Sequence, residues 1–243
     1  MKATIFAGPT LWDDPVMHDR EFQWLPPASE GDVYRIARGR PSAIGLIDGR
    51  FETVPSVWHK ELLWALAQGV HVFGAASMGA LRAAELHRFG MIGVGSVFES
   101  YRMGILEDDD EVAVLHAPAE LNYRPLSEAL VDIRATIEAA KHARAISPRT
   151  ADELVRMARC MFFKDRNWDS LLKIARAHGL PDKQIKALDR LVLKNRVQQK
   201  RLDALKMVEA MRRLLRKNPQ PFRPKFQFRH TVYWQKLVDS HEA

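Results

Sequence analysis

Short, uniformly apolar runs alternate with helical patterns through the first half of the chain. Residues 2–7, 43–47 and 70–76 are apolar almost throughout, and turn residues close the first two. Strands without polar alternation are typical of a parallel sheet that helices cover on both faces. We therefore predict three core strands of such a sheet.

Helices are predicted between and after these runs. Ser56 is a suitable N-cap for a first helix, because apolar residues recur at helical spacing after it until Gly69. Beyond the third run, residues 80–87 have high helix propensity. We expect residues 89–95 to form a turn-rich strand or a loop, residues 96–103 a short helix, and residues 112–115 another short strand.

The second half has an almost entirely helical pattern. Amphipathic spacing predicts helices at residues 126–137 and 168–175, and Ser147-Pro148 supplies a capping hydroxyl followed by proline at the first helical position. Residues 181–217 read as one long basic helix, before an aromatic tail that is extended or irregular. We therefore predict an α/β fold with a mostly parallel sheet and flanking helices, followed by an all-helical C-terminal region. The predicted domains are residues 1–122 and 123–243.

Composition and sequence patterns limit the expected cellular compartment and the expected kinds of site. The chain has 243 residues and 47% hydrophobic composition, enough to bury a core. Its single cysteine, Cys160, cannot form an internal disulfide, and no Cys and His residues have zinc-ligand spacing. The N-terminus lacks a signal-peptide pattern, and no apolar run reaches the roughly 18 residues of a membrane span. We therefore expect a cytoplasmic protein with no membrane partner and no cofactor.

Charge is distributed unevenly along the chain. Residues 1–143 hold 13 Lys and Arg against 20 Asp and Glu, whereas residues 144–243 hold 24 against 10, so their net charges are −7 and +14. A basic half can attract nucleic acid, an acidic protein or an acidic peptide. Alternatively, its charges are only the solvated faces of amphipathic helices.

One segment combines the features of a nucleophile site. The third strand runs through small residues into Ser77, and a helix with Met78 and Gly79 in its first turn follows. Open α/β sheets bind ligands at the carboxyl ends of their strands, and helix N-terminal amides stabilise an anion or a developing oxyanion. The pattern Ala75-x-Ser77-x-Gly79 is that of a nucleophile elbow with its first glycine replaced. Ser77 is therefore a candidate nucleophile, with the alternative that it only caps its helix.

A serine nucleophile needs a base. His59 is preferred because it lies early in the helix before the third strand and can face the same crevice. His87 lies about 15 Å along the helix from Ser77, and His71 lies within a strand, where a core histidine is the simpler interpretation. Lys60 is a second candidate base or an anion clamp.

Carboxylates and a further cation are placed around this candidate site. Arg82 and Glu85 share one face of the Ser77 helix, where a surface ion pair is the alternative interpretation. Asp48 follows the second strand, where its carboxylate can orient the base or bind a cation, although an Asp-Gly turn is the commoner explanation. The acidic run at residues 107–111 resembles a metal site only in composition, because consecutive carboxylates point in different directions. We assign no metal to it.

Three segments carry a resemblance to a known family. They are residues 44–61, residues 74–86 with the sequence GAASMGALRAAEL, and residues 98–112. Together they resemble the core of the TfuA-like family over roughly residues 2–140. Residues 75–80 alone are also similar to the nucleophile segment of Clp-type serine peptidases. The basic helical half matches the TfuA-like pattern poorly.

The resemblance implies a role beside a YcaO enzyme. TfuA-like proteins accompany YcaO enzymes that install thioamides in peptide backbones. The family is understood to release sulfide from a thiocarboxylated, ThiS-like sulfur-carrier protein and to bind YcaO. The partners that it implies are a YcaO enzyme, a ThiS-like carrier and, as a further candidate, the precursor peptide.

Together, the resemblance and the residues suggest thiocarboxylate hydrolysis. Ser77 attacks the carrier's terminal thiocarboxylate, or positions the water that attacks it. His59 is the general base, oriented by Glu85 or Asp48. The first amides of the Ser77 helix hold the oxyanion, and the nearby lysine or arginine holds the anionic sulfur or the product carboxylate.

Two alternatives use the same residues differently. In the first, the chain is a non-catalytic adaptor that docks YcaO with its peptide substrate or sulfur carrier, and Ser77 is a helix cap. In the second, the basic half binds nucleic acid. The absence of a zinc finger, of helix-turn-helix spacing and of an RNA-recognition aromatic motif weighs against the second.

Overall fold

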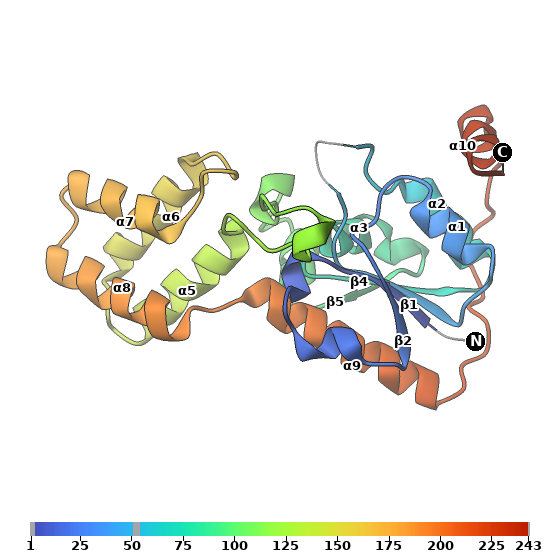
Figure 1. The fold of residues 1–243 in the computed structure, drawn as a ribbon, viewed down its shortest axis with the longest axis horizontal. Helices are drawn as coiled ribbons and strands as arrows, with labels where there is room; N and C mark the ends of the chain where they lie inside the picture. Colours follow the sequence, from blue (N-terminus) through green and yellow to red (C-terminus); the bar gives the residue numbers. More distant parts are fainter. Residues whose placement is uncertain (1–2, 51–53, 243) are drawn as a thin grey trace. The chain divides into compact units, whose positions relative to one another are not determined.

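The computed structural model describes residues 3–50 and 54–242, and within these ranges five strands form an all-parallel sheet (Figure 1). The strands lie in the spatial order β2-β1-β3-β4-β5. Residue 2 of the first predicted strand and residues 51–53 of the first family-like segment lie outside the described ranges. The strands are β1 (Ala3–Phe6), β2 (Phe22–Leu25), β3 (Ala43–Leu46), β4 (His71–Ala75) and β5 (Ile92–Val94).

Helices flank the sheet, and further helices follow it along the chain (Figure 1). This confirms the predicted α/β class with a helical C-terminal region. The predicted cap at Ser147 is confirmed, because its side chain accepts a hydrogen bond from the amide of Thr150. None of the helices in the described ranges has the length and apolar character needed to cross a membrane. The helices are α1 (Asp32–Ala37), α2 (His59–Ala67), α3 (Met78–Leu86), α4 (Ser96–Arg102), α5 (Leu130–His142), α6 (Pro148–Cys160), α7 (Trp168–Ala177), α8 (Asp182–Asn195), α9 (Gln199–Arg216) and α10 (Val232–Glu242).

Contacts divide the chain into two units. Unit 1 comprises residues 1–107 and 201–243, and unit 2 comprises residues 108–200. The sheet, helices α1 to α4 and the C-terminal helices therefore belong together, whereas α5 to α8 form unit 2. This division differs from the predicted boundary after residue 122, because the chain returns to the sheet after α8.

Helix α9 covers one face of the sheet in unit 1. Its side chains Ala204, Met207, Val208 and Met211 are buried in one apolar cluster with residues of β1, β3 and β4. A Cβ atom added to Gly45 in β3 would lie 2.7 Å from the Met211 sulfur, so the glycine makes room for this helix. Helices α1, α2 and α3 lie on the opposite side of the sheet (Figure 1).

The predicted long helix at residues 181–217 is wrong, since residues 196–198 interrupt it. The backbone of Arg196 is extended, with ψ of 141°. The amide of Val197 donates to the Thr136 hydroxyl of α5 at 2.9 Å, and the amide of Lys200 donates to Asp132 at 2.9 Å. The interruption contains no glycine or proline, so these polar partners from another helix end α8.

Three smaller predictions are also corrected. Residues 112–115 are not a strand, because Val112 closes a 3₁₀ turn and the Leu115 amide donates to the Ser127 hydroxyl at 2.8 Å. Ser56 does not cap α2, which begins after Trp58 with Glu61 accepting the Trp58 amide at 3.0 Å. The tail is irregular only as far as residue 231, since α10 follows it.

Unit 2 has its own apolar core. Side chains from α5, α6, α7 and α8 meet in one buried cluster that includes Leu130, Leu154, Trp168 and Leu188. Asn167 caps α7 by accepting the amide of Ser170. The apolar stripes predicted from helical spacing therefore face one another within this unit.

Candidate functional site

The carboxyl ends of three neighbouring strands lie side by side in unit 1. Phe6 of β1 pairs with Leu46 of β3, and Leu46 pairs with Gly74 of β4. The strand order reverses between β1 and β3, and open α/β sheets bind ligands outside the carboxyl ends at such a reversal. The segments that follow these strands therefore form the candidate site.

Asp48, which follows β3, binds the loop after β1. Its side chain is 1% exposed, and it accepts hydrogen bonds from the amides of Gly8 and Thr10 at 2.9 and 3.1 Å. The Thr10 hydroxyl donates to the same carboxylate at 2.6 Å. These contacts direct the carboxylate to the β1 loop rather than to His59, so that Asp48 holds two of the strand-end segments together.

Ser77 follows β4 in a very tight turn. Its amide donates to the carbonyl of Ala75 at 2.8 Å, two residues back, and the intervening Ala76 has φ of 67°. Such a turn is uncommon for a residue with a side chain and stores backbone strain. Ser77 begins α3 with 9% of its surface exposed, and its side chain makes no cap hydrogen bond to the helix. The simple N-cap interpretation is therefore not the geometry observed.

Two glycines allow α3 to begin directly against the sheet. A Cβ atom on Gly79 would lie 1.7 Å from the carbonyl oxygen of Leu46, and one on Gly74 would lie 2.1 Å from the carbonyl oxygen of Gly79. Because both obstacles are backbone atoms, they cannot turn aside as a flexible side chain could. The position of Ser77 thus depends on glycine at these two positions.

We predict that Gly79→Ala lowers the free energy of unfolding by about 1–3 kcal/mol, because the methyl group overpacks α3 against β3. Urea denaturation monitored by circular dichroism measures this change. The matched control is Gly39→Ala, whose added Cβ would lie 3.5 Å from its nearest neighbour, the Ile36 carbonyl oxygen. The control is expected to change stability by less than about 1 kcal/mol. Equal losses in the two variants would contradict the close-approach argument.

The first amides of α3 are not equally available as oxyanion donors. The Gly79 amide donates to the carbonyl of Ile47 at 3.1 Å, and the Ala80 amide donates to the carbonyl of Ser77 at 2.9 Å. Within the described residues, the Met78 amide has no such acceptor. Of the two predicted oxyanion donors, Met78 is therefore the one that can bind a ligand without breaking an internal hydrogen bond.

His59, Arg82 and Glu85 form one cluster between α2 and α3. Nε2 of His59 lies 2.7 Å from Oε2 of Glu85, and Nη1 of Arg82 donates to the same oxygen at 2.8 Å. Arg82 also donates to the carbonyl of Val57 at 3.0 Å and is 11% exposed. Burial raises the pKa of Glu85, but hydrogen bonds from His59 and Arg82 outweigh burial and hold this pKa below its usual range. Glu85 is therefore a fixed carboxylate that orients the imidazole.

Arg82 and Glu85 of this cluster lie on the second and third turns of α3, away from the serine at its start. Glu85 is eight residues after Ser77, which corresponds to about 12 Å along the helix axis. The imidazole of His59 is bound there by Glu85, with Arg82 3.5 Å from the same ring nitrogen. The structure thus brings three predicted residues together and directs them toward one another.

Lys60 points away from this cluster. Its ammonium group donates to the carbonyl of Arg229 at 2.6 Å and to the Thr231 hydroxyl at 3.3 Å, and it lies 5.2 Å from the ring centre of Phe228. These partners belong to the segment between α9 and α10. Sequence alone could not indicate this contact, because the partners are about 170 residues away along the chain.

The two other histidines considered as bases have separate partners. His71 begins β4 half-buried, and its Nε2 lies 2.9 Å from the carbonyl oxygen of Gln220. It is therefore satisfied, as expected, but by a surface contact rather than in the core. Nδ1 of His87 lies 2.8 Å from the carbonyl oxygen of Ala84, one turn back in its own helix.

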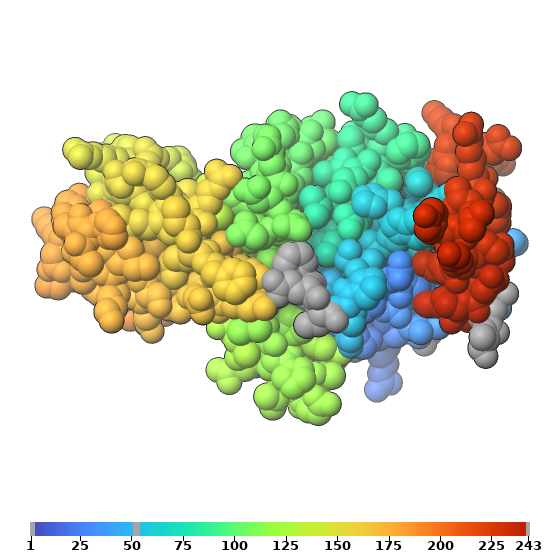
Figure 2. Space-filling view, turned by 90° about the horizontal axis from the view of Figure 1, so that it is seen from above, coloured from blue at the N-terminus to red at the C-terminus, as the bar shows by residue number. Residues whose placement is uncertain are grey.

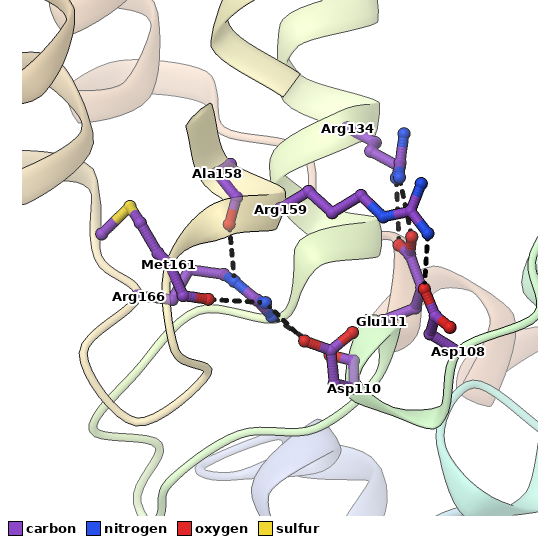
Figure 3. A network of polar contacts seen from close by, with 8 residues as sticks. All are labelled: Asp108, Asp110, Glu111, Arg134, Ala158, Arg159, Met161 and Arg166. Carbon is purple, nitrogen blue, oxygen red and sulfur yellow. Dashed lines mark hydrogen bonds and ion pairs between the residues drawn. The ribbon is translucent and has the colours of Figure 1, made fainter. Parts of the chain in front are cut away.

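Three carboxylates of the acidic run pair with arginines within unit 2, namely Asp108, Asp110 and Glu111 (Figure 3). Asp108 pairs with Arg159 at 2.7 Å, and Glu111 pairs through both oxygens with Arg134 at 2.7 and 3.0 Å. The described residues contain no group of His, Cys, Asp and Glu that could hold a metal ion. Consecutive carboxylates therefore bind different cations, and the run forms part of the packing of unit 2.

Arg166 is the residue of this network that sequence reasoning missed. Its side chain is 0% exposed, and it donates to the carboxylate of Asp110 at 2.9 Å and to the carbonyls of Ala158 and Met161 at 3.2 and 3.1 Å (Figure 3). A fully buried arginine is rare unless it is paired. Nothing in its local sequence distinguishes it from an exposed arginine.

Comparison with protein families gives an assignment for about half of the chain. Residues 48–167 match the family model described as TfuA-like protein. The chain carries a TfuA-like domain. No curated protein matches the chain. The TfuA-like segment begins at Asp48 and therefore contains every candidate site residue discussed above. It starts later and ends later than the expected range of residues 2–140, and it includes Arg166.

Its TfuA-like domain associates the protein with YcaO-dependent thioamidation. The domain includes β4, β5 and helices α2 to α6, whereas β1, β2 and β3 precede it and α9 follows it. The carboxyl ends of β1 and β3, and the helix that covers one face of the sheet, therefore come from outside the TfuA-like segment.

Proposed function

We propose that this protein hydrolyses the C-terminal thiocarboxylate of a ThiS-like sulfur carrier and delivers the sulfide to a YcaO enzyme. The observation that carries the proposal is the strained turn that presents Ser77 between β4 and α3, with the Met78 amide beside it. Strained backbone at the end of a parallel strand is common where a nucleophile is held for attack.

The proposed reaction is acyl transfer to water. Oγ of Ser77 bonds to the carbonyl carbon of the thiocarboxylate, and its proton passes to a base. The Met78 amide stabilises the oxyanion of the tetrahedral intermediate. The carbon–sulfur bond then breaks, and sulfur leaves as sulfide. Water hydrolyses the resulting ester, which restores the serine and leaves a carboxylate on the carrier.

His59 is the proposed base, held by Glu85. Because Glu85 lies about 12 Å along the helix axis from Ser77, the imidazole that it holds acts on the serine through a chain of water molecules or after turning about its side-chain bonds. Arg82 is the proposed binding group for the anionic sulfur or the product carboxylate, because a guanidinium binds such groups through two parallel hydrogen bonds. Lys60 contributes to partner binding rather than to chemistry, since it is bound to the C-terminal segment.

The test is direct measurement of sulfide. Purified protein is incubated with a thiocarboxylated ThiS-like carrier, and sulfide is measured over time beside carrier alone. We expect catalytic release, with an ester between Ser77 and the carrier detectable by mass spectrometry after acid quench. Release no faster than the spontaneous hydrolysis of the carrier would rule out the hydrolase.

The second candidate is a non-catalytic adaptor that docks YcaO with its peptide substrate or sulfur carrier. It is favoured by the low exposure of Ser77 and by the internal hydrogen bonds of Gly79 and His59. An adaptor increases thioamide formation by YcaO when free sulfide is supplied, and it does so without releasing sulfide itself. A reconstituted reaction supplied with free sulfide therefore separates the two functions.

A further inference from the structure

Residues 217–231, here called the strap, connect α9 to α10 along unit 1 (Figure 1). The strap is held by its backbone, because the Phe222 amide donates to the carbonyl of Gly69 at 2.8 Å and the Arg229 carbonyl accepts from Lys60 at 2.6 Å. It is also held by aromatic contacts. These join Phe222 to His71 at 5.9 Å, Phe226 to Phe89 at 5.7 Å and Phe228 to Trp234 at 5.1 Å between ring centres.

A buried tryptophan fixes the far end of the strap. Trp234 of α10 is 0% exposed and packs against Tyr34 and Trp64, with ring centres 5.3 and 5.8 Å away. Figure 2 shows the C-terminal residues, in red, lying on the blue and light-blue surface of the first part of the chain. The strap therefore has a defined course and is anchored at both ends.

The strap exposes its cations, whereas its phenylalanines pack against the protein. Phe222, Phe226 and Phe228 are half-buried, whereas Arg223, Lys225 and Arg229 are exposed. The phenylalanines occupy even-numbered positions and the cations odd-numbered positions of the strap, which bends at residues 225 and 226. The three phenylalanines thus face the fold, and the three cations face solvent.

No acidic residue balances these cations nearby in sequence, since the chain has no Asp or Glu between Glu209 and Asp239. In the described part of the chain, the side chains of Arg223, Lys225 and Arg229 make no ion pair with a carboxylate. By contrast, Arg212 on α9 binds Asp19, Glu21 and Glu209. A charged surface without internal partners is available for an external one.

We infer that the strap is a preorganised docking strip for an acidic face of a protein partner. Residues 223–229 span about 20 Å when extended, which is comparable to one side of a small protein domain. A backbone that is held in place before binding loses little conformational freedom on binding, and opposite charge accelerates encounter. The partner chemistry that fits is a cluster of Asp and Glu side chains on a folded protein.

The orientation of the aromatic rings favours a protein over nucleic acid. Proteins that bind single-stranded nucleic acid stack bases on exposed aromatic side chains beside their cations. The three phenylalanines of the strap are turned inward, so its exposed side carries the cations alone. Ion pairing with carboxylates needs no stacking surface.

The strap lies beside the candidate site, so a partner bound to it is close to the proposed chemistry. Lys60, which binds the Arg229 carbonyl, directly follows His59 at the start of α2. A partner docked on the strap is therefore held next to the cluster of His59, Arg82 and Glu85. If the proposed function holds, this partner is the sulfur carrier, and docking places its C-terminal tail at the site; the docking strip itself does not depend on hydrolysis.

The experiment compares wild type with the triple variant Arg223→Glu, Lys225→Glu, Arg229→Glu. The probes are fluorescein-labelled poly-L-glutamate and poly-uridylate, each of about 20 units, in about 50 mM and about 300 mM salt. A third probe is unmodified ThiS-like carrier. We expect wild type to bind polyglutamate and carrier, and the triple variant to bind both at least about tenfold more weakly. Higher salt is expected to reduce the difference.

A matched variant controls for net charge. Lys173, Lys183 and Lys194 are exposed on unit 2, and their replacement by Glu changes the net charge equally. This variant is expected to bind like wild type. Equal loss in both variants, wild-type binding by the strap variant, or strap-dependent binding of poly-uridylate but not polyglutamate would each overturn the inference. Because binding is measured with unmodified carrier, failure of sulfide release would leave this result unaffected.

Discussion

Replacement of Ser77 by alanine is expected to lower the rate of sulfide release from thiocarboxylated carrier at least about 1,000-fold, because the variant has no nucleophile. The carrier should still bind with an unchanged dissociation constant, since the charged docking contacts lie elsewhere. The measurement is single-turnover sulfide release alongside carrier binding by fluorescence anisotropy. Loss of kcat without loss of affinity is the signature of a group that acts on the reacting atoms.

Two further variants sharpen this test. Ser77→Cys keeps a nucleophile and is expected to form a thioester with the carrier, which mass spectrometry detects. Ser100→Ala is the matched control, because the Ser100 hydroxyl donates to the Ser96 carbonyl at 2.8 Å within α4 and has no proposed part in the reaction. Sulfide release by Ser77→Ala at the rate of Ser100→Ala would show that Ser77 is not the nucleophile.

Replacement of Arg166 by methionine is expected to lower the free energy of unfolding by about 3–5 kcal/mol. Methionine fills much of the space but donates no hydrogen bonds, so the carbonyls of Ala158 and Met161 lose their guanidinium partner inside the protein. Differential scanning calorimetry is expected to show a melting temperature lower by roughly 10 °C.

Arg159→Met is the matched control within the same network. Arg159 and its partner Asp108 are 61% and 52% exposed, and exposed pairs contribute less than about 1 kcal/mol. Each variant removes one arginine that pairs with the acidic run. The difference between their melting temperatures therefore measures the effect of burial. Similar melting temperatures for both would show that the contacts of Arg166 contribute no more than a surface pair.

Local signals in the sequence were sufficient for most elements of the fold. Uniformly apolar runs predicted β1, β3 and β4, and the hydroxyl of Ser147 before Pro148 predicted the start of α6. Such features act within a few residues, so a pattern reveals them directly. The strand order and the division into units depend on contacts between distant segments, which no local pattern records.

The errors share this cause. The apolar stripe of α9 showed that the helix has a buried side, but it did not show that this side covers β1, β3 and β4. The break after α8 has no glycine or proline, because hydrogen bonds to Thr136 and Asp132 of α5 create it. Arg166 is buried by partners from two separate places in the chain, Asp110 and the end of α6.

In the candidate site, too, the sequence predicts local pairs but not contacts between distant segments. The pair of Arg82 and Glu85 follows from a spacing of three residues on one helix, and the structure contains it at 2.8 Å. The pairing of His59 with Glu85 depends on how α2 packs beside α3. The direction of Lys60 depends on the strap, and the use of the Gly79 amide depends on the closeness of β3.

The return of α9 to the sheet has a consequence for biosynthesis. The ribosome releases all five strands before it has made the helix that covers one face of them. Roughly 120 residues separate β5 from the end of α9, and their synthesis takes about 6–24 s at ordinary translation rates. During this interval apolar side chains such as Ile5 and Phe73 have no cover from α9, so the nascent chain is a natural client for chaperones that bind exposed apolar strands.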